Sequence, residues 1–252
     1  MISAEIILML FATGIVSGVI NVIAGGSSLL TFPVLVASGL PPVVANATNF
    51  VAVLPGNASA LPSYAPELKK NRKMAVWLVA ASLAGGLVGN LFLIHTTNEF
   101  FLEIIPWLIL TATLIYTFAD RIRMILRARD SDGEIAPSFT HLFIVFLFSI
   151  YGGYFGAGLG VIMLAVLTLI GYSDFHEANA LKNLTNTMIG ALGVLIFAFS
   201  DLISWPHAII MMAGAAIGGN IAVRFARRIS QKLLANTVIV LGFCLTIYYF
   251  LN

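Results

Sequence analysis

The fold is decided by a stretch that occurs twice, first as Asn21-Val-Ile-Ala-Gly-Gly-Ser-Ser-Leu-Leu-Thr-Phe-Pro33. Past the midpoint it returns as Gly152-Gly-Tyr-Phe-Gly-Ala-Gly-Leu-Gly160. A polar turn and an Ala-Asn-Ala element, at 45–47 and at 178–180, follow each copy and lead into another apolar run. Glycine-rich breaks between apolar segments are typical of membrane helices that stop in mid-bilayer and offer backbone groups to a ligand. We therefore interpret the two stretches as the halves of one binding site.

The composition indicates the class of protein. Of the 252 residues, 60% are hydrophobic and 10% are charged, and the mean hydropathy is +0.99. A water-soluble core could not bury this much apolar surface, so we predict an all-α integral membrane protein. The single cysteine, Cys244, excludes an internal disulfide. The first residues lack the basic leader of a signal peptide, so we expect the first hydrophobic segment to stay as a membrane helix.

Ten apolar segments follow one another and divide into five plus five. Two of them, 28–38 and 159–171, are too short to cross, because about 12 residues at ~1.5 Å each reach ~18 Å against a hydrocarbon core of ~30 Å. We expect these two to be half-helices, either re-entrant or parts of broken spans. The ten segments are 2–20, 28–38, 46–63, 74–94, 100–118, 138–156, 159–171, 178–200, 207–225 and 232–251.

The basic residues predict the topology, because all but one of the thirteen fall into three clusters. The positive-inside rule places these clusters in the cytoplasm, which leaves 95–99, 201–206 and both termini outside. The short segments must then count as crossings. An eight-span topology with two re-entrant loops would place one cluster outside. The clusters are Lys69, Lys70, Arg72 and Lys73, then Arg121, Arg123, Arg127 and Arg129, then Arg224, Arg227, Arg228 and Lys232.

A second repeated pattern predicts that the halves are inverted. The segment Ala84-Gly-Gly-Leu-Val-Gly-Asn90 matches Gly214-Ala-Ala-Ile-Gly-Gly-Asn220, yet the topology runs the first outward and the second inward. We therefore predict a 5+5 inverted repeat of residues 1–126 and 138–252, joined by a cytoplasmic linker at 127–137. Such repeats recur in secondary transporters, which hold their substrate between the halves near the midplane.

The thirteenth basic residue, Lys182, is the strongest single indication of function. It stands at the start of an apolar run, where a buried ammonium needs an anion or carbonyl groups as partners. We interpret Lys182 as facing an anionic substrate. The alternatives are a lysine that snorkels to the interface, or a structural pair with Glu177 or Asp174.

The polar groups near Lys182 and the breaks suit an anion. Helix N-termini carry unpaired N–H donors and partial positive charge, and glycines let an oxyanion approach the backbone. Asparagine and threonine add uncharged donors. Asn21 is either a ligand or a structural tie, and we expect Gly14–Gly18 and Gly85–Gly89 to serve close helix packing. The predicted substrate-binding residues are Gly25, Gly26, Ser27, Ser28, Asn46, Thr48, Asn49, Gly158, Gly160, Asn179, Lys182, Asn183 and Asn186.

These residues resemble the sulfite exporter TauE/SafE family of bacterial membrane permeases over nearly the whole chain. The resemblance rests on 25–33, 39–49, 152–160, 180–182 and 218–228. It implies outward transport of sulfite, an organosulfonate such as sulfoacetate, or a related sulfur oxyanion across the plasma (inner) membrane. Many relatives carry a longer glycine run where this chain has Gly25-Gly-Ser-Ser28, a difference that bears on pocket size.

We therefore expect a secondary transporter that exports a sulfur-containing oxyanion by alternating access. An anion channel, or a permease for another small carboxylate or inorganic anion, is the alternative, because a half-helix anion site also suits a pore. No paired catalytic groups recur in facing segments, so we expect no enzyme and no catalytic residue. We also expect no cofactor.

The remaining ionisable residues give weaker indications. The four histidines, at 95, 141, 176 and 207, lack metal-ligand spacing, so no metal site is predicted. His176 with Asp174 could carry a coupling proton, because histidine titrates near neutral pH. The partners expected are a small anionic solute and membrane lipids, with no nucleic acid, and self-association into a homo-oligomer stays open.

Overall fold

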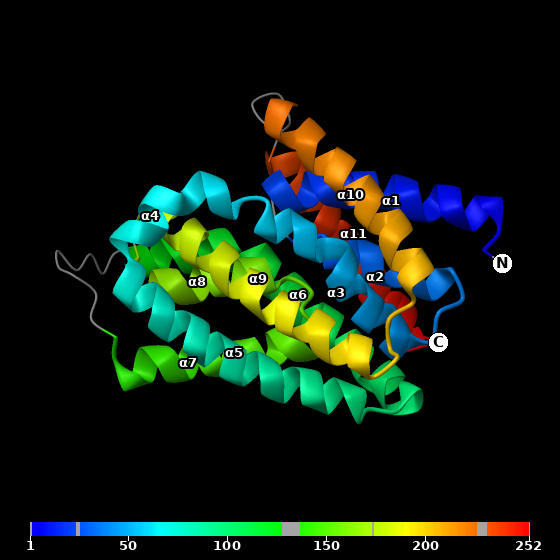
Figure 1. The fold of residues 1–252 in the computed structure, drawn as a ribbon, viewed down its shortest axis with the longest axis horizontal. Helices are drawn as coiled ribbons and strands as arrows, with labels where there is room; N and C mark the ends of the chain where they lie inside the picture. Colours follow the sequence, from blue (N-terminus) through cyan, green and yellow to red (C-terminus); the bar gives the residue numbers. More distant parts are fainter. Residues whose placement is uncertain (1, 24–25, 128–136, 173, 226–230, 252) are drawn as a thin grey trace.

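Every regular element in the described part of the chain is helical. The computed structural model describes residues 2–23, 26–127, 137–172, 174–225 and 231–251, which form eleven α-helices and one 3-10 helix (Figure 1). The elements are α1 (Ala4–Ile23), α2 (Ser28–Ala37), α3 (Pro42–Ala58), η1 (Leu61–Tyr64), α4 (Ala65–Lys70), α5 (Arg72–Ile94), α6 (Asn98–Arg127), α7 (Phe139–Tyr154), α8 (Leu159–Ile170), α9 (Phe175–Phe199), α10 (Trp205–Phe225) and α11 (Gln231–Leu251).

Each of the ten predicted segments corresponds to one helix, and the prediction of an all-α membrane protein is confirmed. The sequence pattern gives no sign of η1 and α4, because elements of 4 and 6 residues are too short to show apolar periodicity. Pro62 and Pro66 stand in their first turns, where a missing N–H costs no intrahelical bond. By length and composition, four helices of the described chain could each cross a membrane, namely α1, α5, α6 and α9.

The two short helices begin at glycine turns. α2 has 10 residues and α8 has 12, which confirms the prediction of two segments too short to span. Gly26 before α2 has φ of +79°, and Gly156 and Gly158 before α8 each have φ of +72°. Only glycine adopts this left-handed backbone at little cost. Each short helix packs against the helix that precedes its break, α2 against α1 and α8 against α7.

Two helix pairs pack at backbone contact. α1 lies along α10, and α5 lies along α7. A Cβ atom on Gly14 would lie 2.3 Å from the carbonyl oxygen of Met211, and one on Gly85 would lie 2.2 Å from that of Phe146. Side chains at these positions would push the helices apart, so the expected role of Gly14–Gly18 and Gly85–Gly89 in close packing is confirmed.

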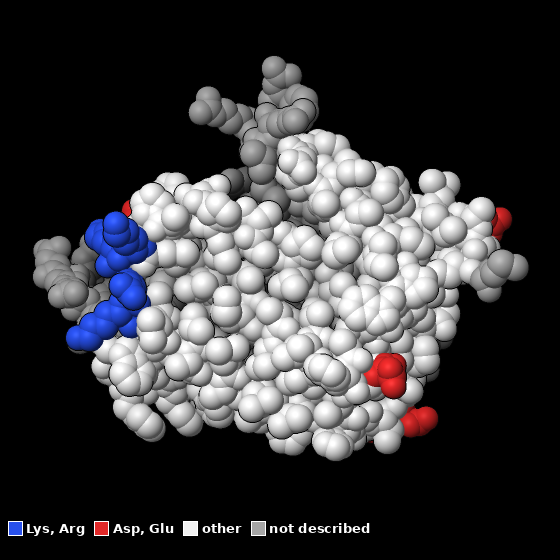
Figure 2. Space-filling view, viewed as in Figure 1, with Lys and Arg blue, Asp and Glu red and all other residues white. Residues whose placement is uncertain are grey.

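The ends of the molecule differ in the charge they present. Figure 1 places α4 at one end, and the beginning of α1 and the end of α11 at the other. On the face shown in Figure 2, the Lys and Arg side chains gather at the α4 end, whereas acidic side chains lie at both ends. The cluster of Lys69, Lys70, Arg72 and Lys73 belongs to α4 and the start of α5. Arg129, Arg227, Arg228 and nearly all of the predicted linker lie outside the described residues.

The α1–α10 contact makes the substitution Gly218→Ala destabilising. Its Cβ would lie 1.9 Å from the backbone oxygen of Ile15, and backbone cannot give way as a side chain end can. We expect a thermal midpoint in detergent lower by about 5 °C. Gly160→Ala is the matched control, since its Cβ would meet nothing closer than the Asn186 amide at 3.5 Å. Equal midpoints for the two variants would contradict the tight contact.

Candidate functional site

One cavity of about 50 Å³ lies where the two breaks meet. It has room for several waters or one small ion, since a cavity that holds a single water needs a volume of only ~15 Å³. Its walls come from α1, α2, α3, α7, α8 and α9, so both copies of the repeated stretch contribute. Eight of the thirteen predicted substrate-binding residues line it, namely Gly26, Ser27, Ser28, Asn49, Gly158, Gly160, Lys182 and Asn186.

The first turns of α2 and α8 both border this cavity. In the described part of the chain, neither Ser27 nor Gly158, the residue before each helix, caps its helix with a side-chain hydrogen bond. The first N–H groups of a helix have no partner within that helix, and the helix dipole gives them partial positive charge. The N–H groups of Leu29 and Leu159 bond carbonyls of the preceding turns, which leaves the N–H groups of Ser28 and Gly160 without a described acceptor. One backbone donor from each half of the chain is therefore available to a ligand in the cavity.

Corresponding positions of the two halves line the cavity. Three lining residues on α3, spaced about one helical turn apart, each have a counterpart on α9 that follows it by the same number of residues. Three lining residues at the first break likewise have counterparts at the second break, again separated by one fixed number of residues. The pairs are Asn49 and Lys182, Val53 and Asn186, Asn57 and Gly190, then Asn21 and Gly152, Ser27 and Gly158, Ser28 and Leu159.

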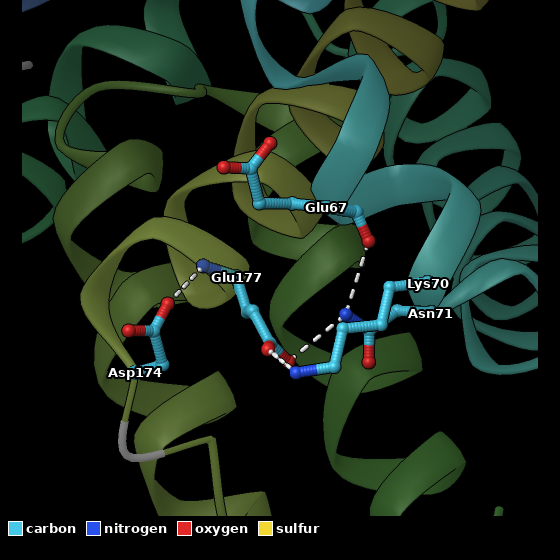
Figure 3. A network of polar contacts seen from close by, with 5 residues as sticks. All are labelled: Glu67, Lys70, Asn71, Asp174 and Glu177. Carbon is cyan, nitrogen blue, oxygen red and sulfur yellow. Dashed lines mark hydrogen bonds and ion pairs between the residues drawn. The ribbon is translucent and has the colours of Figure 1, made fainter.

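Lys182 lines the cavity from α9. Figure 3 shows the two acidic residues before it, Asp174 and Glu177, bound to other groups. The Glu177 carboxylate forms an ion pair with Lys70 and accepts a 2.9 Å hydrogen bond from the Asn71 amide. Asp174 accepts a 2.8 Å bond from the Glu177 backbone N–H and so caps α9. The hydrogen bond that Lys70 donates to the Glu177 carboxylate raises the pKa of Lys70, which is an exposed surface group. These contacts tie α4 to the start of α9.

Two asparagine amides complete the polar wall. The Thr31 hydroxyl donates to the Asn49 Oδ1 atom, which joins α2 to α3 and leaves the Asn49 amide nitrogen as the group available to a ligand. Asn186 is 6% exposed, and its Oδ1 atom has no hydrogen-bond partner among the described residues. Buried polar atoms without partners are rare in folded proteins, and this amide oxygen is an acceptor that a water or another hydrogen-bond donor would satisfy.

Four other predicted residues lie outside the cavity, and substrate contact by them stays a prediction. The Asn46 amide donates to the Tyr154 carbonyl at 2.8 Å, and the Thr48 hydroxyl accepts from a backbone N–H at 3.0 Å. The Asn179 amide donates to the Tyr64 hydroxyl at 2.6 Å. Asn183 is buried on α9. Gly25 lies outside the described residues.

The predicted proton-coupling residues stand at the exposed start of α9. Asp174 caps the helix, and the His176 ring packs edge-on to Phe175 with centroids 5.8 Å apart. Neither of them lines the cavity. Among the described residues, no group of three or more His, Cys, Asp or Glu could hold a metal ion.

Part of the lining escaped the sequence argument. Phe50, Leu54 and Ile189 give the cavity an apolar wall, and Asn57 adds an amide. Asn57 could have been found, because it stands two helical turns after Asn49 in an apolar run. Asn21 lines the cavity and also packs against Gly56. A Cβ atom on Gly56 would lie 2.2 Å from the side-chain amide nitrogen of Asn21.

The cavity is accessible toward the α4 end and closed toward the other. Asn57, near the end of α3 that leads to α4, is partly exposed, as is Lys182 near the start of α9. Toward the beginning of α3, Asn49 is 2% exposed and Phe50 is 6% exposed. Phe155, at 1%, packs its ring against other buried aromatic rings and completes the closed side.

The chain belongs to the sulfite exporter TauE/SafE family, whose sequence profile matches residues 10–249. This confirms the family that the repeated motifs indicated. The family, together with the apolar helices, makes the chain a multi-pass membrane transporter.

Curated relatives carry names of the same kind. A "Probable membrane transporter protein" of Haemophilus influenzae is 27% identical over 97% of this chain and 94% of its own length. The "Probable membrane transporter protein ORF9" of a Sinorhizobium species is 27% identical over 96% and 92%. The "Probable membrane transporter protein YfcA" of Escherichia coli is 26% identical over 96% and 88%. No solved structure is significantly similar to the chain.

The difference in exposure along α3 predicts a difference in chemical reactivity. In a Cys244→Ser background, which removes the free exposed cysteine, we expect Asn57→Cys to react with a small water-soluble thiol reagent about tenfold faster than Asn49→Cys. Both residues line the cavity on one face of one helix, so they differ mainly in depth. Faster labelling at position 49 would contradict the closed side.

Proposed function

We propose that this transporter exports a small sulfur-containing oxyanion, such as sulfite or an organosulfonate, by alternating access. The observation that carries the proposal is the meeting of one lysine with two uncapped helix N-termini on a single cavity. Among the described lining residues, Lys182 alone carries a formal charge. Ammonium, backbone N–H and amide donors all favour an anion over a cation.

The apolar part of the wall supports a substrate with a small organic portion. The side chains of Phe50, Leu54 and Ile189 form no hydrogen bonds, while Lys182 and the helix N-termini supply donors to the same cavity. An organosulfonate such as sulfoacetate could place its sulfonate among the donors and its carbon atoms against these side chains. The family description also names sulfite.

Alternating access rests on the proposed 5+5 inverted repeat, residues 1–126 and 138–252. It is supported by the corresponding cavity positions and by the helix pairs α1–α10 and α5–α7, each of which joins the two halves. Inverted repeats commonly transport by rocking one part against the other around a fixed central site. The cavity, accessible at the α4 end, then corresponds to the inward-facing state.

The orientation follows from charge. With the α4 end in the cytoplasm, its basic cluster obeys the positive-inside rule, and both termini lie outside a bacterial inner membrane. The same cluster raises the local concentration of anions at the entrance. The partners under this proposal are the anion and membrane lipids, and a homo-oligomer is compatible with it.

An anion channel, or a permease for another small carboxylate or inorganic anion, is the competing function. The uncapped helix N-termini favour it as much as they favour a carrier, because both can line a pore. The closed aromatic side favours the carrier. Saturable flux with competition between anions supports a carrier, and large single-channel currents support a pore.

Replacement of Lys182 by alanine should lower the affinity for sulfite or sulfoacetate by about a hundredfold, because a charge-assisted contact is lost. Ligand-dependent thermal shift in detergent measures this, with sulfate and taurine as comparison ligands. Lys70→Ala is the matched control, since it removes an exposed lysine whose described contact is Glu177 on the surface. Undiminished binding by Lys182→Ala would contradict the electrostatic basis of the site.

Proton coupling through His176 and Asp174 is a separate proposal. If protonation of His176 drives export, a pH gradient across proteoliposomes should accelerate sulfite efflux, and His176→Ala should remove that acceleration. Initial rates with and without the gradient measure the effect. An efflux rate that changes neither with the pH gradient nor with the substitution would exclude this pair as the proton carrier.

A further inference from the structure

Asn90, near the end of α5, is a buried amide outside the cavity. Its side chain is 0% exposed, and both Oδ1 and Nδ2 lack a hydrogen-bond partner among the described residues. An amide carries both donors and an acceptor, so burying it without hydrogen-bond partners lowers the stability of the folded protein. A core that needed only to fill this space would use an apolar side chain, so the amide requires an explanation beyond packing.

Asn90 lies directly behind a wall of the cavity. A Cβ atom on Gly193 would lie 3.1 Å from Asn90 Oδ1 and 2.8 Å from Cδ1 of Phe50. The same Phe50 ring lines the cavity, and its opposite edge lies near Gly156, whose Cβ would be 3.5 Å from Cζ. The phenyl ring therefore stands between the cavity and the Asn90 amide.

A second buried amide, that of Asn46, has an oxygen atom left unpaired by the described residues. Asn46 precedes Phe50 by one turn of α3, is 0% exposed, and has no described partner for Oδ1. Its Nδ2 atom donates to the carbonyl of Tyr154, whose backbone nitrogen would lie 2.7 Å from a Cβ on Gly89, the residue before Asn90. Asn46 and Asn90 thus flank the end of α7 from two sides.

The Asn46 and Asn90 amides lie between the cavity and its closed end. α9 begins beside α4, so Gly193 is one turn farther from the α4 end than Gly190, which lines the cavity. α3 runs the opposite way, which also places Asn46 beyond Phe50. An anion that leaves the cavity away from the α4 end therefore meets the Phe50 ring first and the two amides next.

The other half of the chain shows that the amide is not a packing requirement of the repeated motif. Asn220 ends the matching Gly-rich segment of α10, but it is exposed and donates to the Ala216 carbonyl of its own helix at 3.0 Å. The same residue type is therefore satisfied locally in one half and left buried and unsatisfied in the other. The difference fits a role of Asn90 in the path.

We propose that Asn90 forms a second binding station for a small oxyanion in transit, separated from the cavity by the Phe50 ring. The Nδ2 N–H groups of Asn90 replace part of the hydration shell of the anion once the ring has moved aside, while Asn46, whose amide nitrogen already bonds the Tyr154 carbonyl, borders the station. This inference rests on the proposed function, because it assumes that an anion crosses the protein.

The test separates binding at the cavity from passage beyond it. Sulfite is the probe, with ligand-dependent thermal shift for binding and initial efflux from proteoliposomes for passage. The variants are Asn90→Leu, Asn90→Ala, which adds no volume and so guards against misfolding of the first, and the control Asn220→Ala. We expect both Asn90 variants to bind sulfite like the wild type while efflux falls about tenfold. Asn220→Ala should bind sulfite and export it like the wild type.

Each other result overturns the proposal in a recognisable way. Efflux at the wild-type rate in both Asn90 variants would show that the amide takes no part in passage. Equal loss of binding and efflux would make Asn90 a support of the cavity, without a station of its own. A wild-type protein that neither binds nor moves sulfite, sulfoacetate or sulfate would overturn the proposed function and this inference together.

Discussion

The hydrocarbon core of a membrane offers no hydrogen-bond partners, and this constraint explains why the two helix breaks share one cavity. Each backbone N–H left unpaired in hydrocarbon costs several kcal/mol, so a helix can begin in mid-bilayer only against protein or a polar space. α2 and α8 both begin at glycine turns, and their first turns border the same cavity. A single polar space therefore serves both helix ends, and the N–H donors that border it suit the anion that we propose as substrate.

The position of each break is set by contacts between the two halves. α1 leads into the first break and is held by α10, while α7 leads into the second and is held by α5. Because these contacts run through backbone at Gly14 and Gly85, the helices have little freedom to slide or separate. The Thr31–Asn49 hydrogen bond then fixes α2 against α3. Each half thus orients the break of the other, which keeps the polar groups of both facing one space.

The sequence predicts elements better than it predicts which side chains meet. Apolar length and the glycine turns located all ten segments, since both signals are local. Eight of the predicted site residues share the cavity: five flank the breaks, whose meeting the repeat implied, and Asn49, Lys182 and Asn186 lie on α3 and α9. Asn46 and Asn179 look equivalent in sequence to residues that line it, but their amides bind Tyr154 and Tyr64. Those partners come from distant elements, so no spacing rule along one segment could reveal them.

The two halves differ at the one charged position among the described lining residues of the cavity. Asn49 and Lys182 occupy corresponding positions, so a fully symmetric site would hold two ammonium groups or none. A lysine at membrane depth costs about 3 kcal/mol or more, and a second one nearby would add repulsion in the empty state. Under the proposed function, one ammonium among neutral donors attracts an anion more strongly than two amides would, and it still allows the anion to be released in each transport cycle.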